Sequence, residues 1–177
     1  MKYLSLFVSI IIISSCGDAL NIDIPSTYQA TDVEILEVTA YRYTNGQYEE
    51  IPLAEAGQPN TSGMTGGGDI LELLTDSELV FDDGFGKQTL QYETADGNLR
   101  FISNGSAYDL QTSADGTTLL SRRVGGGEFD DANPFTTVSA TCEDEGCEDV
   151  NPSGYLFSST EGTVGYIIIY NEVFTKQ

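Results

Sequence analysis

Two cysteines in the C-terminal part of the chain are close enough to react with each other. Cys142 and Cys147 enclose a short acidic segment. In an exported protein two close cysteines most often form a disulfide, and closing so short a loop constrains the unfolded chain by roughly 2 kcal/mol. The alternative is half of a thiolate metal site, for which the sequence offers no second pair of ligands. The spacing therefore favours a disulfide between Cys142 and Cys147.

The segment after this pair resembles the opening of an EF-hand-type calcium loop. Asp149, Asn151 and Ser153 place oxygen-bearing side chains at alternate positions. The bidentate glutamate of such a loop is expected at position 160, where the chain has Thr160, and Glu161 comes one residue late. Asn-Pro turns in an acidic surface loop explain the same residues without a metal. Calcium is thus the one cofactor that the sequence suggests, and the metal-free alternative stays open.

Most enzymatic chemistry is excluded by composition. The chain has no histidine, which removes the usual general base, the common catalytic triads and most transition-metal sites. Apart from Lys2, the lysines are Lys87 and Lys176, so a serine–lysine arrangement is nearly excluded. With 28 Asp and Glu residues, neighbouring carboxylates are expected by chance, and paired-carboxylate glycan hydrolysis is the only enzymatic alternative. We expect a non-enzymatic protein.

The overall charge limits the partners. The net charge is −21, and a surface this acidic repels nucleic acid and anionic lipid head groups. A nucleic-acid partner is therefore not expected, and a membrane could be contacted only through a separate anchor.

The N-terminus supplies a candidate for that anchor. Lys2 precedes an apolar stretch from Leu4 to Ile13, which is too short for a permanent membrane helix and is placed like the apolar region of a secretory signal. The next residues resemble the lipobox of a bacterial lipoprotein, with an aliphatic residue, two small residues and a cysteine: Ile13-Ser14-Ser15-Cys16. The alternatives are an ordinary signal peptide cut nearby and a retained anchor helix.

The lipobox resemblance implies how the chain is processed and where in the cell it is located. Residues 1–15 would be removed, and Cys16 would carry several acyl chains, palmitate among them, which hold a protein stably on a membrane. Residues 16–31 show no apolar period and contain Pro25, so they are predicted to be the lipidated cysteine and a flexible tether. The implied location is the cell envelope, on the outer membrane, with the periplasmic or surface face left open.

The elements that follow are predicted to be strands in a single domain, residues 32–177. Its centre is a meander of four strands between Lys87 and Val124, whose alternating runs are separated by Asp-Gly and Asn-Gly turns. These dipeptides tolerate the positive φ of tight hairpin turns. Before the meander we expect strands at 32–44, 47–53, 69–74 and 78–82; after it, an apolar strand at 164–174 is expected to close the sheet.

Two segments are predicted to be loops. Residues 54–68 are rich in Pro, Gly, Ser and Thr and contain Gly66-Gly67-Gly68. Residues 125–162 begin with three glycines and are predicted to form a long acidic loop. Loops of such length are usually functional or mobile.

This order of strands and turns, together with the lipobox, resembles the small lipocalin-like lipoproteins of Gram-negative bacteria. The resemblance covers residues 32–124 and 163–175, although the Gly-Xaa-Trp of many lipocalins is missing because the chain has no tryptophan. It implies an all-β fold, an up-and-down antiparallel barrel of about eight strands. An immunoglobulin-like β-sandwich is the alternative.

The barrel prediction favours one function and leaves one alternative. The expected function is a carrier for a small apolar ligand, lined by Leu90, Tyr92, Leu99, Phe101, Tyr108 and Leu110, with an entrance near the glycine-rich loop at 63–68. We also expect Leu71, Leu73, Leu79, Phe81 and Ile168 to point inward. The other is a module with a solid core that contacts a protein or glycan partner through its loops, because small barrels can be filled by their own side chains.

Overall fold

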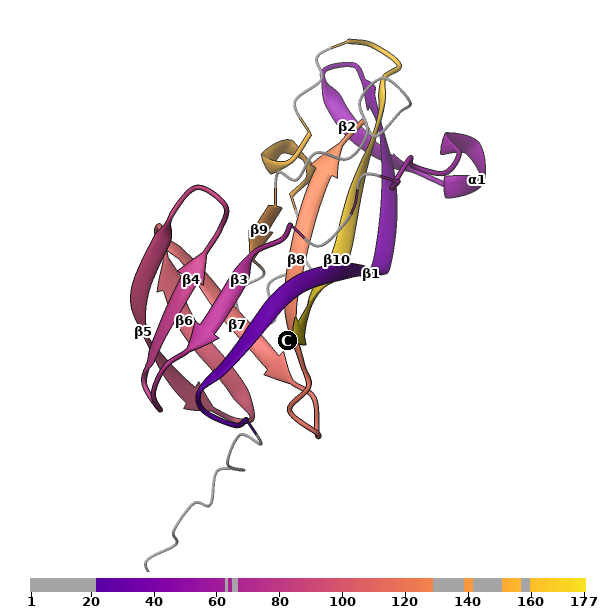
Figure 1. Ribbon diagram of the computed structural model, residues 1–177. Helices are drawn as coiled ribbons and strands as arrows, with labels where there is room; N and C mark the ends of the chain where they lie inside the picture. Colours follow the sequence, from indigo (N-terminus) through magenta and orange to yellow (C-terminus); the bar gives the residue numbers. More distant parts are fainter. Residues whose placement is uncertain (1–21, 63, 65–66, 129–138, 142–150, 157–159) are drawn as a thin grey trace, which may run out of the picture.

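The computed structural model describes residues 22–62, 64, 67–128, 139–141, 151–156 and 160–177 (Figure 1). Two short helical turns are described, α1 (Leu53–Ala56) and the 3-10 turn η1 (Pro152–Gly154). The strands are β1 (Ser26–Thr44), β2 (Gln47–Ile51), β3 (Ile70–Leu73), β4 (Glu78–Asp82), β5 (Lys87–Ala95), β6 (Asn98–Ser103), β7 (Ser106–Thr112), β8 (Thr118–Gly127), β9 (Ser139–Thr141) and β10 (Val164–Lys176).

Eight of these strands close into a barrel. Their order around the ring is β10-β1-β3-β4-β5-β6-β7-β8, and β8 pairs with β10 to complete it. Each of these pairings is antiparallel. The predicted antiparallel barrel is therefore confirmed, its architecture is consistent with a lipocalin-like fold, and the immunoglobulin-like alternative is wrong.

The hairpin turns of the meander form at the predicted Asp-Gly and Asn-Gly dipeptides. Asp96 and Asn104 have φ of 53° and 51°, and the glycine after each has φ of 81°. Two successive residues with positive φ match the right-handed twist of the flanking strands, which is why these dipeptides make tight hairpins. The resulting register sets Tyr92 opposite Phe101, and Phe101 opposite Tyr108.

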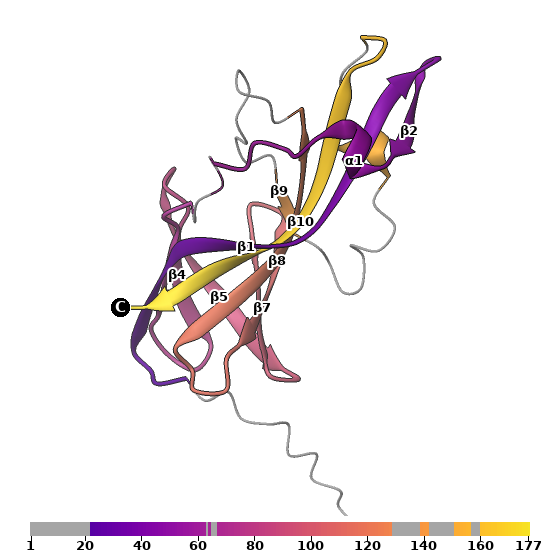
Figure 2. The same cartoon turned by 90° about the vertical axis from the view of Figure 1, so that its right-hand side faces the viewer.

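β1 leaves the barrel halfway along its length. Its register with β10 shifts between Ala30 and Asp32 and again between Ile35 and Glu37, which marks two bulges or irregularities in the strand. Beyond them, β1, β8 and β10 continue past the barrel and are joined by β2 and β9 (Figures 1 and 2). We call this extension the upper sheet.

One face of the upper sheet is covered by the connection from β2 to β3. Buried Ala40, Tyr166, Ile168 and Tyr170 form the cluster on this face, and Leu53, Ala56 and Met64 are among the residues that pack against it. The Tyr166 hydroxyl donates a hydrogen bond of 3.0 Å to the Ala56 carbonyl oxygen at the end of α1. The prediction of a loop without structure at 54–68 missed this short helix.

The opposite face is covered by the segment that contains η1. Leu156 is buried with Val124, Ile167 and Ile169, and Tyr155 packs against them. The close approach depends on a glycine, because a Cβ atom on Gly126 would lie 2.5 Å from the Tyr155 Cβ atom and 2.9 Å from its carbonyl oxygen. The prediction that the acidic loop begins at residue 125 is therefore wrong: residues 125–127 belong to β8, and Gly126 makes room for Tyr155, the residue that follows η1.

The folded part also begins earlier than predicted. β1 starts at Ser26, whereas residues 16–31 were expected to be a tether. Tyr28 and Ala30 point into the barrel core, and the Tyr28 hydroxyl donates a hydrogen bond of 2.7 Å to the Gly116 carbonyl oxygen. The short alternation after Pro25 is a strand because β3 and β10 pair with it, which the local sequence does not reveal.

Among the described residues, no helix has the length and apolar character needed to cross a membrane.

Candidate functional site

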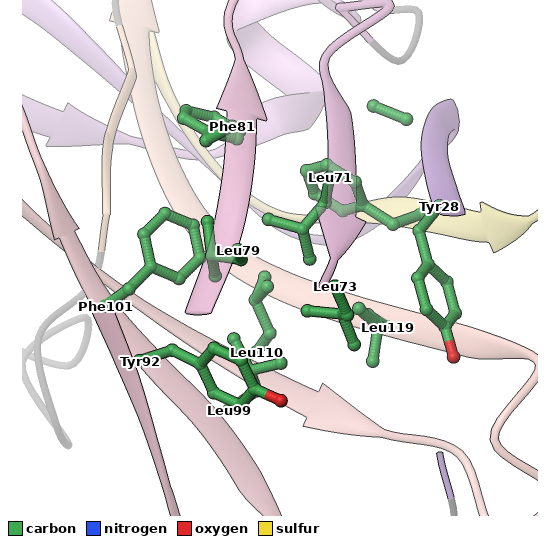
Figure 3. Close-up of a cluster of buried hydrophobic side chains, with 12 residues drawn as sticks. Tyr28, Leu71, Leu73, Leu79, Phe81, Tyr92, Leu99, Phe101, Leu110 and Leu119 are labelled. Atoms are coloured by element: carbon green, nitrogen blue, oxygen red, sulfur yellow. The ribbon is translucent and has the colours of Figure 1, made fainter. Parts of the chain in front are cut away.

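Four of the six residues predicted to line a ligand cavity come together inside the barrel, as Figure 3 shows. Tyr92, Leu99, Phe101 and Leu110 belong to its buried core, and partly buried Leu90 and Tyr108 pack against that core. The remaining members of the core are Tyr28, Ala30, Leu71, Leu73, Leu79, Phe81, Leu119 and Phe174. Ile168 is an exception to the predicted set, because it is buried on the upper sheet instead.

The middle of the barrel is filled by these side chains. Each of the eight barrel strands contributes at least one of them. Leu71, Leu79, Leu99, Leu110 and Leu119 are each 0% exposed, so no space as large as a water molecule adjoins these leucines. Small barrels of eight strands have interiors just wide enough for their own side chains to fill. The walls predicted to surround a ligand are here packed against one another.

Three aromatic rings mark one end of this core. The ring centroid of Phe81 lies 5.4 Å from that of Phe101 and 5.1 Å from that of Tyr108. Phe101 and Tyr108 are stacked, with centroids 4.7 Å apart and planes 3° from parallel. The Arg123 guanidinium carbon lies 5.0 Å from the Tyr108 centroid, within the range of a cation–π contact. The apolar core thus ends at a charged group.

That group belongs to a buried ion pair, which the sequence analysis missed. Arg123 Nη2 lies 2.7 Å from Glu172 Oε2, and each side chain is only 9% exposed. The Gly67 amide donates to Glu172 Oε1 at 3.3 Å, and a Cβ atom on Gly67 would lie 3.4 Å from Asp69 Oδ1. We call Asp69, Arg123 and Glu172 the charged end of the barrel. Gly67, from the segment where the ligand entrance was predicted, therefore lies at this end.

The strands β8 and β10 place Arg123 and Glu172 by simple alternation. Arg123 follows buried Leu119 and Ser121 at spacings of two along β8, and Glu172 precedes buried Phe174 by two along β10. Residues two apart on a strand point to the same face. The sequence therefore held one sign of this ion pair, namely a charged residue two positions from a residue that points into the core.

The electrostatics of the charged end follow from burial. Burial alone would lower the pKa of the Arg123 guanidinium, but the Glu172 carboxylate and the hydroxyls of Tyr108 and Tyr170 outweigh it, and the pKa is raised. Burial and the nearby Glu172 raise the pKa of Asp69 to about 6, against a smaller opposing effect of Arg123. Arg123 is thus a permanent cation that holds one carboxylate directly.

A carboxyl group with a raised pKa beside an ionised one is an arrangement used in acid–base catalysis. In this barrel, however, Glu172 is held by Arg123 and by the Gly67 amide, and its side chain has little exposed surface. A substrate would have to displace those contacts to reach it. The geometry favours a structural ion pair over a catalytic one.

The other predicted site residues are only partly described. Asn151 Oδ1 accepts a hydrogen bond of 3.1 Å from the Ser153 amide and so caps η1. Such a capping turn is what the metal-free alternative expects. Asp149, Cys16, Cys142 and Cys147 lie outside the described residues. Within the ranges that are described, no group of three or more acidic, cysteine or histidine side chains is arranged to hold a metal ion.

Comparison with known proteins adds no information on function, so the functional argument depends on the fold and the side chains. No protein-family model, no curated protein and no solved structure matches the chain.

Proposed function

We propose that this chain is a non-enzymatic, lipid-anchored protein of the cell envelope, whose lipocalin-like barrel serves as an interaction module. The observation that carries the proposal is the packing of the barrel interior, where Leu99 and Leu110 have no exposed surface. A barrel filled in this way works as a rigid scaffold. A partner would then bind to the outer surface of the barrel, and a protein or glycan is the kind of partner that such a surface contacts.

A carrier for a small apolar ligand is the second candidate. It is favoured by Leu90 and Tyr108, which are only partly buried, and by the aromatic rings beside the charged end. Ligand pockets commonly combine such an apolar wall with a few polar groups. A ligand at this position would have to move side chains that now contact one another.

A dye-binding titration separates the two functions. We expect no saturable binding of environment-sensitive apolar dyes or fatty acids to the folded chain, because the leucines in the middle of its interior have no exposed surface. The chain is used with Cys16→Ser throughout, so that no acyl chain binds the dye. Leu110→Ala is the positive control, since removing a fully buried leucine leaves a dry apolar cavity of the kind that takes up small apolar molecules.

Saturable binding without the Leu110→Ala change would contradict the module proposal. If Leu110→Trp then weakened that binding while circular dichroism showed an intact fold, the ligand would lie in the barrel and the carrier function would replace the module.

The anchor is tested independently of the barrel. The order of apolar stretch, small residues and Cys16 leads us to expect that a metabolically supplied fatty acid labels the protein. Cys16→Ala should abolish the label, whereas Ser15→Ala, which keeps a small residue before the cysteine, should retain it. Undiminished labelling of Cys16→Ala would show that the cysteine is not the acylated residue.

A further inference from the structure

The middle of β1 has one edge that no described strand occupies. On one side β1 pairs with β10 from Tyr28 to Arg42. On the other side it pairs with β3 over Ser26–Gln29 and with β2 over Ala40–Thr44. The Ala30 amide still donates to the Asp69 carbonyl oxygen, at 2.8 Å. Residues 31–39 therefore form a gap, which we call the open edge, in the pairing among the described residues.

The direction of the backbone groups follows from the ladder. In an antiparallel pair, successive residues point their amides alternately toward and away from the partner strand. The Val33 amide donates to Asp32 Oδ1 at 2.8 Å, which directs it away from β10. The backbone amides alternate in direction along β1, so the Ile35 amide points the same way as the Val33 amide. The register shift between Ile35 and Glu37 adds one residue to the count, and the next amide on the open edge is therefore that of Val38. The edge is thus a short template for another strand.

The side chains of this interval define what would fit. Ile35 and Leu36 are 42% and 44% exposed, so two adjacent large apolar side chains of this interval reach the surface. Asp32, Glu34 and Glu37 are also exposed, and the Asn171 side-chain amide donates to one oxygen of Glu34 at 3.0 Å. The interval therefore offers apolar contact between acidic groups.

The boundaries exclude a broad partner. β3 closes the interval at one end and β2 at the other, and the connection between them begins and returns at these ends (Figures 1 and 2).

A second copy of this chain that pairs through the same edge would bring Asp32, Glu34 and Glu37 close to their own counterparts. Like charges opposite each other destabilise a strand pair. A short strand of opposite charge is favoured instead.

We propose that the open edge of β1 binds an extended, basic peptide segment of a partner protein by adding it to the sheet as a strand. Backbone hydrogen bonds to the Ile35 and Val38 region supply the affinity, and lysine or arginine side chains opposite the acidic residues supply the selectivity. This inference rests on the interaction-module function and names its surface and its class of partner.

The test uses a synthetic decapeptide of alternating lysine and valine. It is titrated into the full-length Cys16→Ser chain and followed by fluorescence anisotropy and by amide hydrogen exchange. We expect saturable binding, with the Ile35 and Val38 amides exchanging rapidly in the free protein and protected in the complex. Methylating alternate peptide nitrogens keeps every charge and removes the strand donors, and it should weaken binding at least tenfold.

Two variants locate the site. Glu34→Lys with Glu37→Lys should weaken binding at least tenfold, whereas Glu49→Lys with Glu50→Lys, on the nearby strand β2, should leave it within twofold. Binding that survives nitrogen methylation, or that responds equally to both double variants, would show non-specific attraction to an acidic surface and would overturn the proposal.

No binding of the peptide would also overturn it. If apolar dyes still failed to bind, the interaction module would stand and its contact surface would lie elsewhere; if dyes bound, the module itself would fail.

Discussion

Arg123→Met is expected to destabilise the protein by about 3–5 kcal/mol, the cost of leaving one member of a buried ion pair without its partner. Methionine replaces the aliphatic part of the arginine side chain, so the loss of the charged guanidinium dominates the expected effect. The Glu172 carboxylate, 9% exposed and 2.7 Å from Arg123, would remain buried beside Asp69. Denaturant unfolding followed by circular dichroism measures the effect.

The control is the neighbouring residue on the same strand. Arg122 is exposed on the opposite face of β8, so Arg122→Met should change stability by no more than about 0.5 kcal/mol. The double variant Arg123→Met with Glu172→Leu removes both charges and should recover most of the lost stability. If the double variant were no more stable than the single one, the loss would come from packing and not from an unpaired carboxylate.

Gly126→Ala is expected to destabilise the protein by about 1–3 kcal/mol, because an added methyl group would overlap the Tyr155 Cβ atom and approach its carbonyl oxygen. These atoms lie close to the backbone and cannot rotate away, so residues 151–156 would have to move off the upper sheet. Leu156, now buried, would become exposed. Thermal denaturation and hydrogen exchange of the segment measure the two consequences.

Gly154→Ala provides the matched control within the same segment. A Cβ atom there would meet nothing within 4 Å, and the residue does not need a positive φ. Its stability should therefore stay close to that of the unchanged chain. Equal losses for both variants would show that the glycines matter for backbone freedom and not for the approach of Tyr155.

The barrel could be predicted because its information is local. The Asp96-Gly97 and Asn104-Gly105 turns set the meander by their own φ preferences, and the alternation around them set which side chains point inward. The predicted strands at 69–74 and 78–82 are confirmed for the same reason, as β3 and β4.

The elements that depend on distant partners could not be predicted in this way. Residues 125–127 look like a loop until β10 pairs with them and Tyr155 packs on Gly126. Residues 26–30 look like a tether until β3 and β10 border them. Arg123 looks like a surface residue, and only the register of β8 with β10 brings Glu172 to it. The side chains predicted to point into the barrel do so, with Ile168 as the exception, but their close packing follows from side-chain volumes that a pattern does not contain.

The pairing of β1 with β10 also determines when the barrel can form. β10 is the last strand in the sequence, and it joins β1, the first, to β8. Contacts between residues so far apart along the chain close late and slow the folding of β proteins. Until β10 is available, β1 and β8 each keep one unpaired edge that can attract other chains. A chain of this protein that lacks β10 would therefore be aggregation-prone, and a binding factor that shields β1 during synthesis would benefit its folding.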